Sequence, residues 1–147
     1  VRQAADIVFS MDMSNIKNTN RKRAIISIIS PKDKINKKYK KQYEEKMLEL
    51  ISFLIVKGYE ICLMSFCKIE HDEEEIEEIY SKIPEKQRKN VEKYYYDGNV
   101  EEALNTIADS QLVVGGRFHA NIIGLCLGKS ILPVLVIKLY MCYKICK

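Results

Sequence analysis

The residues with the clearest potential for chemistry stand in one short segment, Gly115-Gly116-Arg117-Phe118-His119. The two glycines allow a tight turn and a close approach of the backbone to a ligand. Arg117 carries a planar, permanently charged group that suits a carboxylate or a phosphate. His119 can donate or accept a proton near neutral pH. The pattern indicates an anion site with a proton donor, or a plain strand–turn–helix connection in which Arg117 and His119 make local hydrogen bonds.

The predicted elements around this segment suit an anion-binding turn. Residues 111–114 are an apolar run typical of a buried strand, and residues 117–128 are predicted to form a helix. The first turn of a helix has amide groups without an acceptor inside the helix, so an anion can bind there. In parallel α/β sheets, ligands gather at the carboxyl ends of the strands, where this segment would lie.

The rest of the chain alternates between strand and helix patterns. Runs rich in β-branched and apolar residues predict further strands at 24–30, 60–66, 91–96 and 131–136. Apolar residues at helical spacing predict helices from 43 to Gly58, from 72 to 83 with Asp72 as its cap, and from 99 to 108 with Asn99 and Glu102 as a capping box. We therefore predict an α/β fold, with a Rossmann-like parallel sheet flanked by helices.

The composition excludes several classes of protein. The chain has 147 residues, of which 47% are hydrophobic and 30% charged, values typical of one globular domain and not of a disordered tail, a collagen-like fibre or a disulfide knot. Its net charge of +4 is too small to indicate a nucleic-acid partner. No apolar run is long enough to predict a membrane span. Its 5 cysteines contain no C-x-x-C pair, which favours free thiols in a reducing cytoplasm and no metal site.

The start of the chain is typical of the middle of a protein. It opens on Val1 and not on methionine, and we expect a fragment whose N-terminal part is missing. We divide it into residues 1–20, a linker or remnant of a preceding domain, residues 21–137, a Rossmann-like domain, and residues 138–147, an atypical tail.

The segment around Arg117 resembles the polysaccharide pyruvyl transferase family. That family typically has an apolar strand, a small residue, Arg-Phe-His or Arg-Leu-His, an apolar helix and a proline-containing strand. The matching residues here are Ala108-Asp109-Ser110, Leu112-Val113-Val114, Gly116-Arg117-Phe118-His119-Ala120, Gly124, Gly128 and Pro133. Glu70 and Asp72 also resemble the loop after the family's second strand in this domain.

The resemblance implies the C-terminal half of a two-domain, glycosyltransferase-B-like fold with a cleft between two Rossmann-like domains. It implies transfer of a pyruvyl group from phosphoenolpyruvate to sugar hydroxyls of a cell-surface polysaccharide, which forms a ketal and releases phosphate. The implied partners are phosphoenolpyruvate, a sugar or polysaccharide-precursor acceptor and the missing N-terminal domain, in the cytoplasm, with no cofactor and no metal.

The resemblance also implies roles for single residues. Arg117 would bind the carboxylate or phosphate of the donor, and His119 would be the general acid that protonates its vinyl carbon. The substrate-binding residues would be Arg117 itself, Gly115, Gly116, Phe118 and Lys138, the last because the family often carries a lysine after its final strand.

Beyond Pro133 the sequence departs from the family, which typically has Tyr-Ser, one variable residue and Lys-Thr after the strand. We hypothesise that a frameshift altered the tail. Two alternatives stay open: a sugar-nucleotide glycosyltransferase domain of similar fold, and a non-catalytic truncated remnant. We expect the isolated chain to be inactive, because a cleft enzyme takes its groups from both domains.

Overall fold

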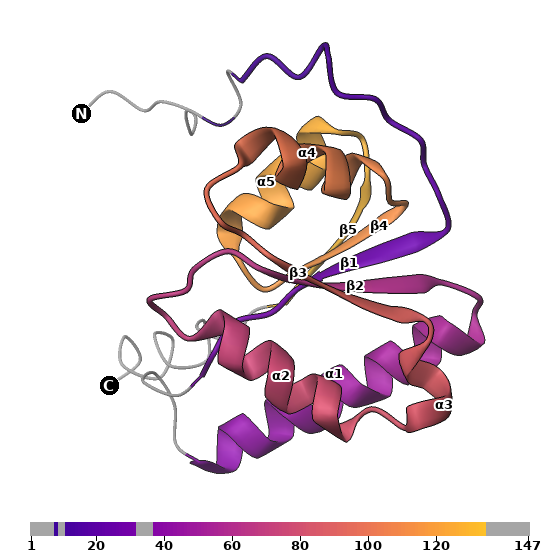
Figure 1. Ribbon diagram of the computed structural model, residues 1–147, viewed down its shortest axis with the longest axis vertical. Coiled ribbons are helices and arrows are strands. Elements are labelled where there is room, and N and C mark those ends of the chain that lie inside the picture. Colours follow the sequence, from indigo (N-terminus) through magenta and orange to yellow (C-terminus); the bar gives the residue numbers. More distant parts are fainter. Residues whose placement is uncertain (1–7, 9–10, 32–36, 135–147) are drawn as a thin grey trace, which may run out of the picture.

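The computed structural model describes residues 8, 11–31 and 37–134, in which strands and helices alternate along the chain (Figure 1). The strands are β1 (Arg23–Ser27), β2 (Glu60–Ser65), β3 (Val91–Tyr95), β4 (Leu112–Gly115) and β5 (Ser130–Pro133). The helices are α1 (Lys37–Val56), α2 (Asp72–Lys82), α3 (Glu85–Arg88), α4 (Val100–Ala108) and α5 (Phe118–Cys126).

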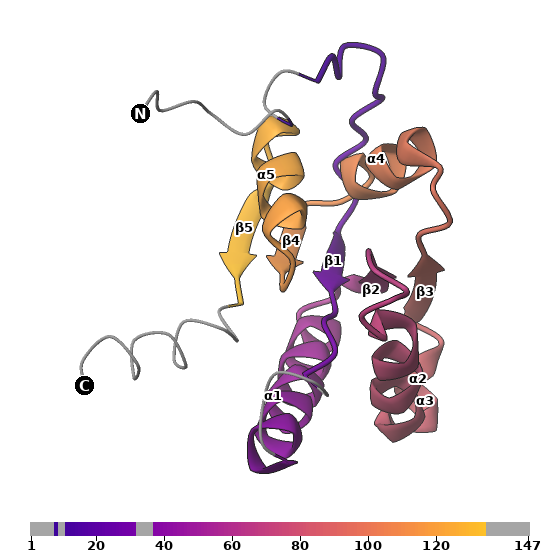
Figure 2. The ribbon, with the colours of Figure 1, turned by 90° about the vertical axis from the view of Figure 1, so that its left-hand side faces the viewer.

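The strands form one sheet in the order β3-β2-β1-β4-β5, and every neighbouring pair is parallel. Figure 2 shows β3 and β5 at opposite edges. The predicted α/β class with a Rossmann-like parallel sheet is confirmed. The chain builds β1, β2 and β3 in one direction and then returns to the other side of β1 for β4 and β5, so the winding reverses between β1 and β4.

Helices cover both faces of this sheet (Figure 1). On one face, α1 and α2 pack on a core that includes Ile26, Ile51 and Ile76. On the other face, α4 and α5 pack on a core that includes Ile25 and Ile107. Ile25 and Ile26 enter opposite cores because neighbouring side chains of a strand alternate between faces. All of β1 is buried, which explains its near-continuous apolar sequence.

The element bounds differ from the predicted ones for physical reasons. β1 ends at Ser27 and not at residue 30, because its partner β4 ends at Gly115, directly opposite Ser27. α1 begins at Lys37, before the predicted start at residue 43, and α3 was not predicted because four residues after Pro84 carry no periodic pattern. The Asn99 capping box is confirmed, since Asn99 Oδ1 accepts a hydrogen bond from the Glu102 amide at 3.1 Å.

The segment before β1 runs past α4 and α5 (Figure 1). Met13 and Ile16 pack against the core under these helices, and Asn18 Nδ2 donates a hydrogen bond to the Leu127 carbonyl at 3.0 Å. In the part of the chain that the structure describes, no helix is both long and apolar enough to cross a membrane. The tail 138–147 and the last residues of the strand predicted at 131–136 lie outside the described residues.

Candidate functional site

The Gly115–His119 segment lies where the winding of the sheet reverses. Ser27 and Gly115, the last residues of β1 and β4, pair with each other, and the Gly116 amide donates to the Ser27 carbonyl at 3.1 Å. A Cβ atom on Gly116 would overlap that carbonyl oxygen, so only glycine fits there. The carboxyl ends of strands at such a reversal are the usual ligand position in open α/β sheets. The topology therefore places the predicted turn at the expected position for a ligand site.

Asn121, which sequence reasoning missed, closes the turn from the helix side. Its Nδ2 donates to the carbonyls of Gly115 and Arg117, both at 3.1 Å. Its Oδ1 is buried and accepts no hydrogen bond, and it lies where a Cβ atom on Gly115 would be. A polar residue four positions after the arginine was the available signal. The amide explains why Gly115 must be a glycine.

Arg117 points its guanidinium at two carboxylates, Glu70 in the loop after β2 and Asp72 at the start of α2. Its Nε and Nη2 donate to the two oxygens of Asp72 at 3.0 and 2.5 Å, and its Nη1 donates to Glu70 at 2.8 Å. Burial opposes the charge, but the hydrogen bonds that Arg117 donates to Asp72 and Glu70 outweigh it, so the pKa of Arg117 is raised above its usual range. The site thus holds one cation whose charge is compensated by two carboxylates.

Asp72 connects three loops at the carboxyl edge of the sheet. Besides Arg117, its oxygens accept from the amides of Ser30 at 3.2 Å and Cys67 at 3.1 Å. These amides follow β1 and β2, while Arg117 follows β4. The prediction that Asp72 caps α2 is corrected: His71, with φ of 63°, is the N-cap, no side chain caps the helix, and Asp72 is its first residue. The carboxylate instead holds the loops together.

Phe118 and His119 lie on the first turn of α5 and are exposed, with their rings 5.7 Å apart in an edge-on arrangement. Arg117 is the N-cap of α5 and its side chain does not cap the helix, so the start of α5 presents the positive end of its dipole to an anion. Five of the predicted site residues therefore lie together at this turn: Gly115, Gly116, Arg117, Phe118 and His119. Lys138 lies outside the described residues.

A comparison with protein families gives one match. A family model described as polysaccharide pyruvyl transferase matches residues 1–135. The chain belongs to this family. No curated protein and no solved structure matches it. Membership identifies a transferase family whose acceptor is a polysaccharide.

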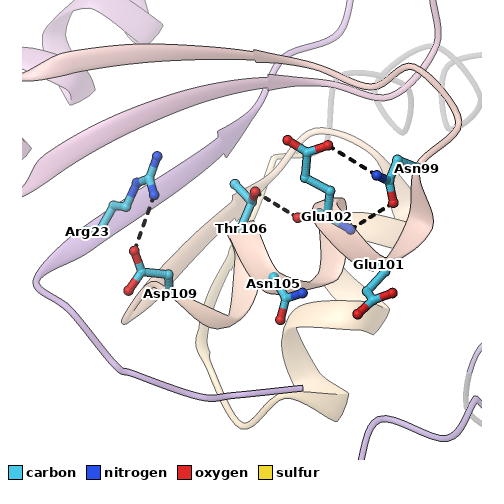
Figure 3. A pocket seen from close by; sticks show the side chains of 7 residues that line it. All are labelled: Arg23, Asn99, Glu101, Glu102, Asn105, Thr106 and Asp109. Carbon is cyan, nitrogen blue, oxygen red and sulfur yellow. Dashed lines mark hydrogen bonds and ion pairs between the residues drawn. The ribbon is translucent and has the colours of Figure 1, made fainter. Parts of the chain in front are cut away.

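A groove of about 450 Å³ along α4 lies away from the motif of this pyruvyl transferase family member. It is lined by Arg23, Asn99, Glu101, Glu102, Asn105, Thr106 and Asp109 (Figure 3). Its one cation, Arg23, is paired with Asp109 within the groove and with Glu92 beside it. The groove has no glycine turn and its polar groups bond mainly to one another. We therefore place the site at the turn before α5.

One acidic cluster has the spacing of a metal site. Carboxylate oxygens of Glu44, Glu75 and Glu78, on α1 and α2, lie within 4.8 Å of one another. The ammonium groups of Lys40 and Lys82 already bridge these carboxylates. The cluster is thus a set of ion pairs between two helices, and the expectation that the enzyme needs no metal stays a prediction.

Proposed function

We propose that this chain forms the donor-binding part of an enzyme that transfers a pyruvyl group from phosphoenolpyruvate to hydroxyls of a polysaccharide or its sugar precursor. The observation that carries the proposal is Arg117, held at the start of an uncapped helix where the parallel sheet reverses its winding. A multiply charged anion favours a fixed cation and a helix N-terminus together. Family membership supports pyruvyl transfer as the reaction.

The chemistry needs a proton donor as well as an anion site. Phosphoenolpyruvate is an enol ester, and protonation of its CH₂ carbon makes the central carbon electrophilic. A sugar hydroxyl then attacks that carbon, and a second hydroxyl displaces phosphate, which leaves a cyclic ketal. In this proposal Arg117 holds the carboxylate or phosphate and His119 delivers the proton, a contribution of general acids worth roughly 10²–10⁴ in rate.

We place the reaction in the cytoplasm and the product in the cell envelope. Cys62, Cys67 and Cys126 are free thiols among the described residues, which suits a reducing compartment. The acceptor contacts would come largely from the second domain that the family resemblance implies. Turnover is therefore measured on the protein that joins this chain to that domain, and donor binding on the 147-residue chain.

The test separates binding from turnover. Arg117→Lys keeps the charge but loses the fork, and phosphoenolpyruvate affinity should fall by about 1.5–3 kcal/mol, the cost of a lost charge-assisted hydrogen bond. Arg23→Lys is the matched control, because Arg23 also pairs with two carboxylates, and it should leave affinity unchanged. Equal losses in both variants would show that Arg117 acts only through folding.

His119→Ala should leave donor binding intact and lower turnover by roughly 10²–10⁴. His71→Asn is the control: His71 is exposed and left-handed at φ of 63°, a conformation that asparagine tolerates. NMR measures turnover as the rate of ketal formation. Normal turnover in His119→Ala would refute the general-acid role.

A further inference from the structure

The two carboxylates that face Arg117 differ in how firmly they are held. The Asp72 side chain is 0% exposed and accepts four hydrogen bonds, two of them from the backbone. The Glu70 side chain is 40% exposed and contacts the guanidinium through one oxygen and one nitrogen, Nη1. An ion pair with such an exposed partner contributes little to stability. Asp72 is therefore a permanent partner, and Glu70 is an exchangeable one.

The geometry of the guanidinium decides where a ligand can bind. A guanidinium has five N–H groups in one plane, and Asp72 takes the edge formed by Nε and Nη2. The remaining side of Arg117, at Nη1, is where Glu70 lies. An anion that binds Arg117 by a two-point contact must therefore approach the position that the Glu70 carboxylate occupies.

The net charge around Arg117 also indicates that a ligand anion must replace Glu70. Arg117 with Asp72 alone is neutral, whereas Arg117 with Asp72 and Glu70 carries a net negative charge. A further carboxylate or phosphate would be repelled by that third charge while Glu70 remains in place. Displacement of Glu70 towards solvent, where its side chain is already partly exposed, removes the repulsion.

We propose that Glu70 occupies the anion subsite of Arg117 in the unliganded protein and is exchanged for a carboxylate or phosphate oxygen of the donor, while Asp72 stays and positions the guanidinium. The inference rests on the proposed function for the identity of the donor. It adds the ligand's place on Arg117 and a residue that sets the affinity. Glu70 lowers donor affinity and excludes weaker anions, since a ligand must compete with an attached carboxylate.

The experiment measures anion binding to the 147-residue chain by calorimetry or NMR titration, with phosphoenolpyruvate, inorganic phosphate and pyruvate as probes. Glu70→Gln should bind phosphoenolpyruvate about threefold to tenfold more tightly than the wild type, as expected for removing one nearby charge. Glu73→Gln removes a charge three residues further along the chain, on α2, where Glu73 pairs with Lys68, and should change affinity less than about twofold. The probe with the larger gain, phosphate or pyruvate, identifies the group that replaces Glu70.

Two results would overturn the inference: unchanged or weaker binding in Glu70→Gln, including no measurable binding of any probe, or an equal gain in Glu73→Gln. The gain must also disappear when Glu70→Gln is combined with Arg117→Lys, and a gain that persists would place the anion elsewhere. A tighter-binding Glu70→Gln chain whose parent enzyme shows no pyruvyl transfer would refute the proposed function and keep the subsite. Pyruvyl transfer by the parent enzyme, with no change of anion affinity in Glu70→Gln, would refute the subsite and keep the proposed function.

Discussion

Two clusters of charged residues, one at the start of α2 and one between α1 and α2, each contain a fully buried carboxylate. At the carboxyl edge of the sheet, each oxygen of Asp72 accepts two hydrogen bonds. Between α1 and α2, Glu75 is equally buried, but no group among the described residues donates a hydrogen bond to either of its oxygens, and the Lys40 ammonium lies at 3.5 Å. Burial alone does not separate the two carboxylates, whereas their hydrogen bonds do.

The consequence for Glu75 is a perturbed protonation state. Burial raises its pKa to about 7, the nearby Glu44 and Glu78 add to the shift, and Lys40 opposes it without reversing it. Its ionisation near neutral pH therefore costs stability. The fully bonded Asp72 instead orients Arg117, a role that depends on satisfied hydrogen bonds. Hydrogen bonding, more than burial, therefore distinguishes the carboxylate that orients Arg117 from the one that does not.

The largest effect on the free energy of unfolding is expected from Asp72→Asn. It leaves Arg117 part-buried without its bidentate partner, and removing one member of a buried ion pair costs about 3–5 kcal/mol. Urea unfolding measures the loss. Asp109→Asn is the control, since Asp109 pairs with Arg21 and Arg23 but is more exposed than Asp72, and should lose less. A loss below about 1 kcal/mol in Asp72→Asn would contradict the assignment.

The next largest effect concerns Glu75→Gln and depends on pH. Folded Glu75 keeps its proton up to a pKa of about 7, whereas the unfolded group releases it near its ordinary value of 4.5. Stability therefore falls as pH rises between these values, by on the order of 3 kcal/mol. The variant lacks this slope, so its melting temperature should rise relative to the wild type from pH 5 to about pH 8.

The matched control for that experiment lies in the same cluster. Hydrogen bonds from Lys40 and Lys82 lower the pKa of Glu78, so its stabilisation is present above its ordinary pKa of 4.5 and is lost as pH falls. Glu78→Gln should therefore lower the melting temperature near neutral pH and have little effect in acid. A Glu75→Gln variant that follows the same pH dependence as Glu78→Gln would show that Glu75 is ionised at low pH.

Several features of the fold were predictable from local patterns in the sequence. The five strands and the main helices follow from local patterns, such as the β-branched run at 24–30 and the helical spacing after residue 43. The Gly115–His119 turn was found because its residue types are unusual together. These sequence signals are local, and they are present because the buried sheet requires apolar strands and the turn requires glycine.

The partners of Arg117 were beyond local reasoning. Asp72 lies 45 positions away from Arg117 in the sequence, and the two meet only because β1 stands between β2 and β4 in the sheet. An acidic residue at the start of a helix is normally explained as a dipole or capping residue, which is how Asp72 was interpreted. The strand order, which no local pattern encodes, turned that residue into the support of the site.

A smaller effect is expected from the backbone that fixes the Arg117 cluster. Gly116→Ala places a Cβ atom against the Ser27 carbonyl oxygen, which cannot move without disturbing β1, and should cost about 1–3 kcal/mol. The three atoms nearest to a Cβ on Gly115 all belong to the Asn121 side chain, so combining Gly115→Ala with Asn121→Ala should recover part of its loss. Unfolding in urea compares the three variants. Equal losses in Gly115→Ala and Gly116→Ala, with no recovery, would contradict this distinction.

The smallest effect should come from Lys82→Gln in the α1–α2 cluster. Lys82 pairs with Glu44 and Glu78, and its side chain is 40% exposed, so the loss should stay below about 1 kcal/mol. Because exposed pairs are screened, that loss should shrink when the salt concentration rises to about 1 M, where the screening length is about 3 Å. The Asp72→Asn loss should not change over the same range, since Asp72 is fully buried. Urea unfolding of both variants at low and high salt measures the two losses of stability. A salt-independent loss in Lys82→Gln would contradict the prediction, because it would mean that the Lys82 ion pairs are as shielded from solvent as the Asp72 pair.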